Sequence, residues 1–316
     1  MSRWRPSANI DNLGQRARLL AELRQFFAER GVLEVETPLL CTSGVTDPAL
    51  SNFTVPCGAT ERFLQTSPEY AMKRLLAAGS GDIYQIGKAF RMGEQGARHN
   101  PEYTLLEWYR EGFDHHRLIR EVGELVATLL GRGAWQVWPW RALLQHVLGP
   151  GIDCADRDEL ERQAGDILSN VPGGLDRDGL LDLLVSHCVE PAIAAWGIVF
   201  IVDYPASQAA LSRLLSSSGG SAVAARFECY VDGMELANGY WECGDPDELR
   251  ARFDDDNRKR RALALPERAI DPGFLAAMEA GLPDCAGVAM GIDRLLALRV
   301  GVDRLEEVLA FDWSRC

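Results

Sequence analysis

Side chains suited to binding phosphates and cations gather in the segment FRMGEQGARHNPEYTLLEWY, at positions 90–109. The segment predicts two strands joined by a loop, with Arg91 at the end of the first strand. An arginine there can hold a phosphate through its planar guanidinium group, and the loop can fold over a nucleotide. Glu107 and Tyr109 are two residues apart in the second strand, so they share one face. A surface hairpin with scattered charges is an equally good interpretation of this segment alone.

A second segment, RFECYVDGMELANGYWE at positions 226–242, predicts a hairpin with acidic side chains in both strands. Glu228 and Glu235 would repel each other unless they shared a proton or a cation. A magnesium ion on nucleotide phosphates would be such a cation. Asn238 and Glu242 follow at an even spacing and could share a face. Outward-facing strand carboxylates are the alternative interpretation.

A third segment, GVAMGIDRLLAL at positions 287–298, predicts a strand that ends at Gly291 and a helix that begins there. The N–H groups at a helix N-terminus can bind anions, and Arg294 would add a positive charge one turn into the helix. A helix start with ordinary capping would have the same sequence pattern, so this segment alone is a weak indication of an anion site.

The elements that must position these side chains follow from the hydrophobic pattern. Residues 12–30 predict an amphipathic helix, and VLEVETPLL at 32–40 predicts a strand with Pro38 at an edge or a bend. The TSPEY segment at 66–70 predicts a helix start in which Ser67 is the cap. Strands come in clusters and hairpins, which favours an α+β fold with an antiparallel sheet flanked by helices.

The region at about 142–195 differs from the rest of the chain. It contains helical patterns rich in Asp, Glu and Arg, interrupted by the sequence PGG at 172–174. We interpret it as a helical insertion in a single catalytic domain that spans residues 1–316. The sequence contains no GxxxxGK[ST] loop and no GxGxxG between a strand and a helix, so nucleotide binding would need another scaffold.

Composition and charge narrow the class of partner. The 316 residues include 33 Lys and Arg against 46 Asp and Glu, a formal net charge of −13. General nucleic-acid binders are usually basic, so this balance argues against that role and suits a cationic substrate. Residues 1–15 lack the apolar region of a signal peptide, and the longest apolar run, 192–202, is too short to span a bilayer. We therefore expect a cytoplasmic protein without membrane attachment.

Taken together and in this order, the segments resemble the three signature motifs of class II aminoacyl-tRNA synthetases. Motif 1 is similar to the helix at 12–30 followed by VLEVETPLL, motif 2 to the segment at 90–109, and motif 3 to GVAMGIDR. The segments TSPEY, RHNPEYTLLEWY and ELANGYWE resemble the lysine-specific branch. The resemblance covers nearly the whole chain.

A narrower resemblance is to the elongation factor P–lysine ligases, which are paralogues of the lysyl-tRNA synthetase core. Lysyl-tRNA synthetases have an anticodon-binding domain before the core, whereas motif 1 here begins almost at the N-terminus. The segments YPASQAAL, FDDDNRKRRALALP and GLPDCAGVAMGIDR are similar to the ligase family. Ala289 also points to it, because lysyl-tRNA synthetases have glycine there and a methyl group would reshape the amino-acid site.

The resemblance implies an ATP-dependent ligase that also uses Mg2+. Lysine or (R)-β-lysine would be activated as an acyl-adenylate and transferred to a lysine of elongation factor P. It further implies a homodimer, with Pro38 near the interface. A truncated lysyl-tRNA synthetase acting on tRNA and a non-catalytic, amino-acid-sensing paralogue remain alternatives.

By the same resemblance, individual residues acquire expected roles. ATP would be bound by Arg91, His99, Asn100, Glu235, Leu236, Gly291 and Arg294, of which Arg91 and Arg294 would be catalytic. The amino acid would be bound by Ser67, Glu69, Glu107, Tyr109, Asn238, Glu242 and Ala289. Magnesium would be held by Glu228 and Glu235.

One position departs from the family pattern. Motif 2 usually begins FRNE, but Gly93 stands at the position of that glutamate. Two outcomes are open. The neighbouring Glu94 makes the nucleotide contact of the usual glutamate, or that contact is absent. Arg91 and Asn100 remain in register with the motif.

Overall fold

The computed structural model describes residues 4–216 and 222–316. The chain divides into two compact units. Unit 1 comprises Met1–Asp114 and Glu242–Cys316, and unit 2 comprises His115–Trp241. Each unit contains part of the predicted sites.

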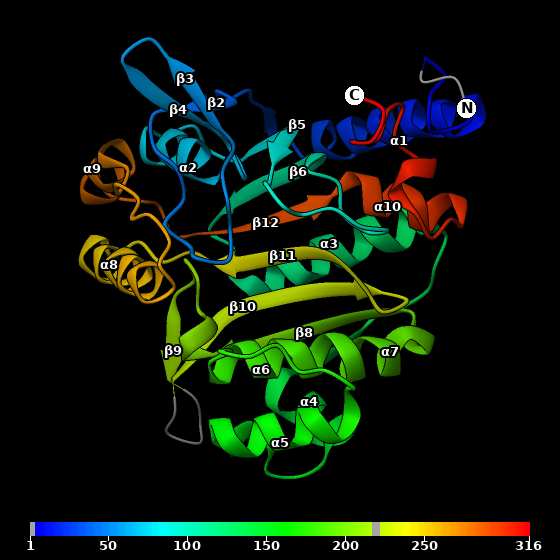
Figure 1. Ribbon diagram of the computed structural model, residues 1–316. Coiled ribbons are helices and arrows are strands. Elements are labelled where there is room, and N and C mark those ends of the chain that lie inside the picture. The colour runs from blue at the N-terminus through cyan, green and yellow to red at the C-terminus, as the bar shows by residue number, and fades with distance from the viewer. Residues whose placement is uncertain (1–3, 217–221) are drawn as a thin grey trace. The chain divides into compact units, whose positions relative to one another are not determined.

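Unit 1 is built on four strands in the order β1 (Leu33–Glu34), β5 (Ile83–Phe90), β6 (Glu102–Glu111) and β12 (Cys285–Gly291). Figure 1 labels β5, β6 and β12 side by side. The β5–β6 and β6–β12 pairs are antiparallel, and the short β1 is parallel to β5. The predicted antiparallel sheet with flanking helices is therefore confirmed, with a parallel strand added at its edge.

The register of these strands aligns side chains in rows. Gln85, Glu107 and Ala289 lie side by side on β5, β6 and β12. Tyr109 and Gly287 form the next row on the same face, because side chains alternate along each strand. This face of unit 1 therefore carries several of the residues predicted to bind the amino acid.

The opposite face of the same strands is covered by α1 (Ile10–Ala28). Its buried residue Phe27 stacks on Tyr84 with ring centroids 4.3 Å apart and contacts Trp108 edge-on at 5.4 Å. Tyr84 and Trp108 are cross-strand partners in β5 and β6. Apolar packing on this side leaves the face of Glu107 and Tyr109 for polar side chains.

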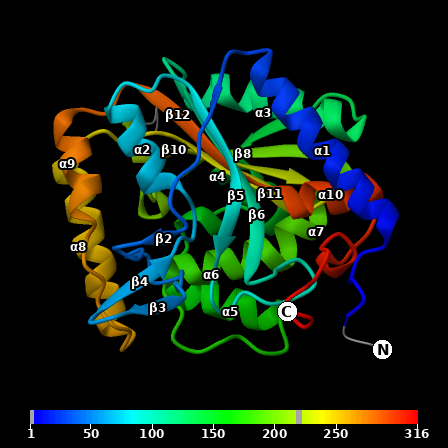
Figure 2. The same cartoon turned by 90° about the horizontal axis from the view of Figure 1, so that it is seen from above.

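The other helices of unit 1 are α2 (Glu69–Ala77), α8 (Pro246–Ala262), α9 (Pro272–Ala280) and α10 (Ile292–Val300). Figures 1 and 2 show α2, α9 and α8 side by side. Tyr70 of α2 packs its ring against Phe274 of α9, at 4.6 Å between centroids, and against Phe253 of α8, at 6.0 Å. This aromatic contact fixes α2, the helix that contains Glu69 and Lys73.

Two local predictions are wrong. The segment at 32–40 is not one strand: β1 ends at Glu34, and β2 (Leu40–Cys41) belongs to a separate three-stranded sheet with β4 (Thr60–Leu64) and β3 (Thr54–Cys57). Pro38 lies in the connection, where it has no N–H to donate to a ladder. Ser67 does not cap α2, whose N-cap is Pro68 without a side-chain capping bond.

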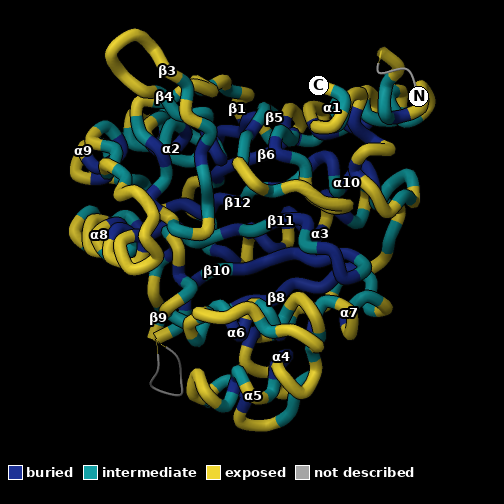
Figure 3. The backbone as a smooth tube through the Cα atoms, viewed as in Figure 1, coloured by how far each residue is buried: buried dark blue, intermediate teal, exposed yellow. Residues whose placement is uncertain are grey.

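Unit 2 has the strand order β11 (Met234–Trp241), β10 (Ala222–Val231), β8 (Ile198–Pro205) and β7 (Gln136–Pro139), with β9 (Leu214–Ser216) paired to β10. The β10–β11 hairpin turns at Asp232 and Gly233, whose φ angles are 52° and 72°. Two positive φ values in succession are typical of a tight turn, and the hairpin predicted for residues 226–242 is therefore confirmed. In Figure 3 most of β10 is drawn as buried.

The helices of unit 2 are α3 (His115–Leu130), α4 (Trp140–Leu148), α5 (Arg157–Ile167), α6 (Arg177–Leu184) and α7 (Glu190–Ile193). The last four occupy the region for which a helical insertion was predicted. A π-helical turn at Val185–Val189 joins α6 to α7. That all these elements form one catalytic domain with unit 1 stays a prediction.

One helical run in the described part of the chain, Arg177–Trp196, has the length and composition of a membrane span. This is weak evidence, because core helices have the same properties. Leu180, Leu184 and Ile193 of this run are fully buried in the apolar core of unit 2, together with Val199 of β8. Part of the run is therefore accounted for by packing within its own unit.

Candidate active site

A cluster of buried charged side chains lies in unit 1, and we call it the carboxylate cluster. It consists of Glu69, Lys73, Glu107, Tyr109 and Glu242. The Lys73 Nζ atom is 2.7 Å from Glu69 Oε1 and 2.6 Å from Glu242 Oε2. The Lys73 side chain is completely buried, and that of Glu242 is 1% exposed. One internal ammonium thus holds together two carboxylates that were predicted to bind the amino acid.

The other half of the carboxylate cluster comes from β6. The Tyr109 hydroxyl donates a 2.7 Å hydrogen bond to Glu107 Oε1. Gly287 of β12 lies opposite Tyr109 of β6. A Cβ atom at Gly287 would lie 2.3 Å from the tyrosine ring and 2.7 Å from Glu242 Oε1. Glycine is therefore required at this position for Tyr109 and Glu242 to approach each other.

Burial dominates the electrostatics of the carboxylate cluster. It raises the pKa of Glu107 to about 8, and the nearby Glu69 carboxylate adds to this effect. It raises the pKa of Glu242 to about 7, although Lys73 opposes the shift. Burial alone would lower the pKa of Lys73, but Glu242 and Glu69 raise it above its usual range. The site therefore combines a permanently charged lysine with carboxyl groups that take up protons near neutral pH.

Sequence reasoning missed Lys73, although a usable signal was present. Lys73 follows Glu69 by four residues in TSPEYAMK, the spacing that places two side chains on one helix face. It also missed Gln85, which lies opposite Glu107 in the strand register. No local pattern could have found Gln85, because the register of β5 against β6 is set by non-local pairing.

The residues predicted to bind the nucleotide's phosphates lie at the end of β5 and the start of α10. Arg294 Nη2 is 2.8 Å from His99 Nε2, and Arg294 Nε donates to the Arg98 carbonyl at 3.3 Å. Partial burial and the Arg294 guanidinium lower the pKa of His99. Arg91 lies over the Tyr103 ring, 5.4 Å from its centroid. Motifs 2 and 3 therefore meet through Arg294 and His99.

Glu94 takes a defined place beside Arg91. Its carboxylate is 3.6 Å from Arg91 Nη1, and Gly93 between them adopts a φ of 91°. A side chain at position 93 would be strained in this conformation. The replacement of the usual glutamate by Gly93 therefore coincides with a turn that brings Glu94 to the arginine.

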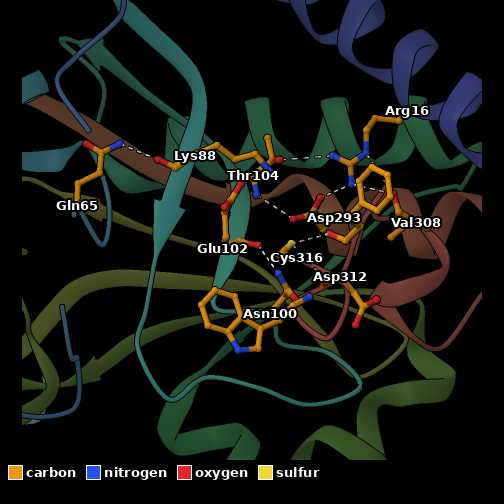
Figure 4. Close-up of polar contacts among 12 residues, drawn as sticks. Arg16, Gln65, Lys88, Asn100, Glu102, Thr104, Asp293, Val308, Asp312 and Cys316 are labelled. Carbon is orange, nitrogen blue, oxygen red and sulfur yellow. Dashed lines mark hydrogen bonds and ion pairs between the residues drawn. The ribbon is translucent and has the colours of Figure 1, made fainter. Parts of the chain in front are cut away.

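The Asn100 side chain is occupied within unit 1. Its Nδ2 atom donates to the Glu102 carbonyl at 2.6 Å, as Figure 4 shows, and its Oδ1 atom accepts from the Trp313 N–H at 3.0 Å. A pocket of about 170 Å³ lies beside it. The pocket is lined by Gln95, Gly96, Ala97, His99, Asn100, Arg304, Leu305, Glu306, Asp312, Trp313 and Ser314. The C-terminal residues thus support the loop of motif 2.

Asp293, the neighbour of Arg294, is buried and holds α10 in place. It accepts a hydrogen bond from the Thr104 N–H at 2.8 Å and pairs with Arg16 of α1 (Figure 4). Arg16 also donates to the Val308 carbonyl at 3.1 Å and 3.2 Å. Residues from all three predicted motifs therefore converge on one carboxylate.

The predicted magnesium ligands lie in unit 2. Glu228 Oε1 is 2.5 Å from Arg226 Nη2, and Glu228 Oε2 accepts hydrogen bonds of 2.7 Å from the Tyr204 and Tyr230 hydroxyls. Glu235 lies on β11 opposite Tyr230. Among residues 4–216 and 222–316 no group of three or more His, Cys, Asp and Glu side chains is placed to hold a metal ion. The donors already on Glu228 do not favour it as a ligand, so magnesium binding stays a prediction.

Other residues predicted to bind ATP or the amino acid lie on β11, β12 and the start of α10. Asn238 is the cross-strand partner of Glu228, and its Oδ1 atom accepts from Arg226 Nε at 3.3 Å. Leu236 is buried in β11, Gly291 is the N-cap of α10, and Ala289 lies beside Glu107. Unit 1 brings together Glu69, Glu107, Tyr109 and Glu242, and unit 2 brings together Glu228 and Asn238. The structure therefore groups most of the predicted amino-acid residues in unit 1 and the predicted metal ligands in unit 2.

The fold and this arrangement define a class II synthetase. Residues 2–136 and 174–314 match the family model described as tRNA synthetases class II (D, K and N). The unmatched residues 137–173 fall largely within the predicted insertion.

Curated relatives narrow the family further. The chain is 48% identical over 314 residues to the elongation factor P–(R)-β-lysine ligase of Mannheimia succiniciproducens, covering 98% of this chain and 97% of that protein. It is 47% identical over 322 residues to the protein of the same name from Vibrio cholerae, covering 99% of each. It is 46% identical over 317 residues to that of Haemophilus influenzae strain PittGG, covering 98% of each. The chain belongs to this ligase family within the class II synthetases and is an ATP-dependent ligase.

Proposed function

We propose that this chain activates lysine or (R)-β-lysine with ATP and transfers the aminoacyl group to a lysine side chain of elongation factor P. The proposal takes the protein substrate from the name of the relatives. It takes the class of amino acid from the carboxylate cluster of unit 1.

The observation that carries the proposal is the charge of that cluster. Three carboxyl groups, those of Glu69, Glu107 and Glu242, surround one ammonium, that of Lys73. When all three are ionised the cluster has a net charge of −2. Lysine and β-lysine each carry two ammonium groups, which require paired carboxylates when they are buried. A diamino acid therefore matches the site in charge and in hydrogen-bonding type.

The proposed reaction has two steps. In the first, a carboxylate oxygen of the amino acid attacks the α-phosphorus of ATP, and the bond to the bridging oxygen breaks to release pyrophosphate. In the second, a lysine ε-amine of the acceptor attacks the acyl carbonyl, loses a proton and displaces AMP. Neither step needs a covalent intermediate on the protein, so positioning and charge stabilisation supply the catalysis.

Roles for the nucleotide-binding residues follow from their chemistry. Arg91 would hold the α-phosphate and Arg294 the γ-phosphate, because a guanidinium stabilises the charge that develops during phosphoryl transfer. His99 supports Arg294 through their 2.8 Å contact. Asn100 would meet the adenine through its backbone, because its side chain is bound to Glu102 and Trp313. Glu235, Leu236 and Gly291 are the other residues that we propose to bind ATP.

Magnesium would neutralise charge on the ATP phosphates when bound. Glu228 and Glu235 are the proposed ligands, although Glu228 already pairs with Arg226 and accepts hydrogen bonds from Tyr204 and Tyr230. No step of the proposed reaction depends on a metal–protein bond.

We also propose a homodimer formed through motif 1, in a cytoplasmic location. The support is apolar exposure in this segment and just before it: Leu33 is 55% exposed, Leu39 and Leu40 are each 40% exposed, and the preceding Ile10 is 73% exposed. Exposed aliphatic side chains gathered in one segment are typical of an interface between subunits. Light scattering after size-exclusion chromatography tests this directly, since a monomer at micromolar concentration would contradict it.

The central experiment uses elongation factor P as substrate. The protein is incubated with the enzyme, ATP and either lysine isomer, and its mass is measured. We expect an added lysyl or β-lysyl mass on one lysine. Efficient charging of tRNA without that added mass would instead identify a truncated lysyl-tRNA synthetase. Absence of both the added mass and tRNA charging would favour a non-catalytic, amino-acid-sensing paralogue.

A substitution tests the amino-acid site. Glu242→Gln removes a charge that pairs with Lys73 and, in the proposal, with the substrate. It should impair amino-acid-dependent pyrophosphate exchange far more than ATP binding measured by titration calorimetry. Equal losses in the two assays would contradict the assignment of Glu242 to the amino acid.

A further inference from the structure

Gln85 is a buried polar residue to which the proposed reaction gives no role. It lies on β5 directly opposite Glu107 of β6, and Ala289 of β12 continues the same row. Gln85 is 3% exposed and Glu107 is 2% exposed. Directly opposed residues in an antiparallel pair point to the same face, so the two side chains are neighbours.

Each of these two side chains ends in an oxygen without a hydrogen-bond donor. Gln85 Oε1 and Glu107 Oε2 are buried, and neither has a partner in the parts of the chain that the structure describes. The other oxygen of Glu107 accepts from Tyr109. Buried acceptors are rarely left unsatisfied in folded proteins, because the lost hydrogen bonds to water are not replaced. Two such oxygens on neighbouring strands indicate a donor that binds from outside the chain.

We propose that Gln85 is a substrate-binding residue, and that its Oε1 atom acts with Glu107 Oε2 to accept hydrogen bonds from the distal ammonium of a diamino acid. The inference rests on the proposed function and deepens it. An ammonium has three donors and no acceptor, which complements one carboxylate and one amide oxygen. Lys73 is already engaged by Glu69 and Glu242, so it does not compete for this position.

A neutral acceptor suits this position better than another acid would. The site already contains three carboxyl groups, and burial together with their mutual repulsion keeps protons on two of them near neutral pH. A fourth carboxyl group beside Glu107 would strengthen that repulsion. An amide oxygen instead adds an acceptor without adding charge. Gly87, two residues along β5, also leaves room for it, since a Cβ there would lie 3.0 Å from Gln85 Nε2.

The inference makes Gln85 a determinant of specificity. Norleucine has the carbon chain of lysine without the distal amine, so it would leave both acceptors unsatisfied. Sites built to hydrogen-bond a substrate group strongly reject analogues that lack it. Removing the Gln85 acceptor should therefore weaken the preference for lysine over norleucine and leave ATP binding unchanged.

The test compares Gln85→Met, which keeps the volume, with Gln85→Glu, which keeps an acceptor. Amino-acid-dependent pyrophosphate exchange gives kcat/KM for lysine, (R)-β-lysine and norleucine, and titration calorimetry gives the affinities of the amino acids and ATP. For Gln85→Met we expect the lysine-to-norleucine ratio to fall by about tenfold or more, with the KM for ATP unchanged. Gln85→Glu should restore most of the ratio at high pH, where the added carboxyl group is ionised.

Gln65→Met is the matched control. Gln65 is also a buried glutamine of unit 1, but its Nε2 atom donates to the Lys88 carbonyl at 2.9 Å (Figure 4). Its substitution should lower the melting temperature without changing the lysine-to-norleucine ratio. If Gln85→Met folds and keeps the wild-type ratio, or if it loses lysine and norleucine activity equally, Gln85 is not a contact of the distal ammonium.

The same measurements separate this inference from the proposed function. If the wild-type protein lacks exchange activity but binds lysine in the calorimeter, the proposed reaction fails, and the affinity of Gln85→Met still decides the role of Gln85. If the wild-type protein binds no diamino acid, both are wrong. If it is active and Gln85→Met is indistinguishable from it, the function stands and the inference is overturned.

Discussion

Asp293 accepts a hydrogen bond from the Thr104 N–H at 2.8 Å and thereby joins the first turn of α10 to β6. The next residue along the helix is Arg294, and Thr104 lies in motif 2, so this bond sets the position of one proposed ATP ligand against the strand of Glu107. Arg16 pairs with the other oxygen of Asp293. The geometry of the proposed nucleotide site thus depends on residues that do not belong to it.

Removal of Arg16 should therefore weaken ATP binding indirectly. In Arg16→Leu, Asp293 keeps the Thr104 bond but loses its cationic partner, which leaves a buried carboxylate uncompensated. We expect the KM for ATP to rise by about threefold to tenfold and the protein to be destabilised by about 2 kcal/mol or more. Steady-state kinetics and denaturant unfolding measure the two effects. Arg18→Leu, which alters an exposed residue of the same helix, should change neither.

Lys73 should be among the most sensitive positions for stability. Lys73→Met leaves Glu69 and Glu242 without their shared cation in a buried site. Loss of one member of a buried ion pair typically costs about 3–5 kcal/mol. Urea unfolding at pH 7 tests this expectation. Lys88→Met is the control, because the Lys88–Glu102 pair is about 40% exposed and should contribute less than about 1 kcal/mol. Similar losses in the two variants would show that burial does not decide the effect.

The pH dependence of stability should reveal Glu107. Its pKa is raised by burial to about 8 in the folded protein, against 4.5 for an ordinary glutamate. Between these values the folded state binds more protons than the unfolded state, so the free energy of unfolding falls as pH rises. Glu107→Gln removes this contribution. Thermal unfolding should therefore show a smaller loss of stability between about pH 5.5 and 8.5 in the variant than in the wild type. Parallel curves would contradict the raised pKa.

Amino-acid affinity should have the opposite pH dependence. An ammonium group binds the ionised form of Glu107, so a proton must leave when the substrate binds below about pH 8. The affinity for lysine should rise from about pH 6 to pH 8.5 and be accompanied by proton release. Titration calorimetry in buffers of different ionisation enthalpy measures the number of protons released. An affinity that is constant across this range would place the ammonium away from Glu107.

The C-terminal residues should matter for nucleotide binding. Trp313 donates its backbone N–H to Asn100, and Ser7 near the N-terminus bonds Asp312 at 2.6 Å. Removal of residues 313–316 takes away the donor to Asn100 Oδ1 and opens the pocket beside the motif 2 loop. We expect a severalfold increase in the KM for ATP and little change in the KM for lysine. Cys316→Ser changes an exposed terminal residue and should leave both constants unchanged.

Much of the site could be predicted from the sequence because its chemistry lies in short segments. Glu107 and Tyr109 share a face through strand periodicity alone, and the structure joins them by a hydrogen bond. The start of α10 after Gly291 was likewise predicted from neighbouring residues alone. Prediction failed at VLEVETPLL, where hydrophobicity indicated one strand. The chain instead leaves one sheet after Glu34 and enters another at Leu40, and a local pattern cannot show where a strand finds its partners.

The sequence by itself determined the class of the protein, since residue types at strand and helix spacing identify the three motifs and the acidic residues that a cationic substrate needs. Only the tertiary structure decided how those acids are used. It placed Lys73 between Glu69 and Glu242, aligned Gln85 with Glu107, and supplied Glu228 with an internal cation from Arg226. These relationships depend on strand register and on burial. Both arise from contacts between distant segments, and burial is also what gives the charges in the site their strength.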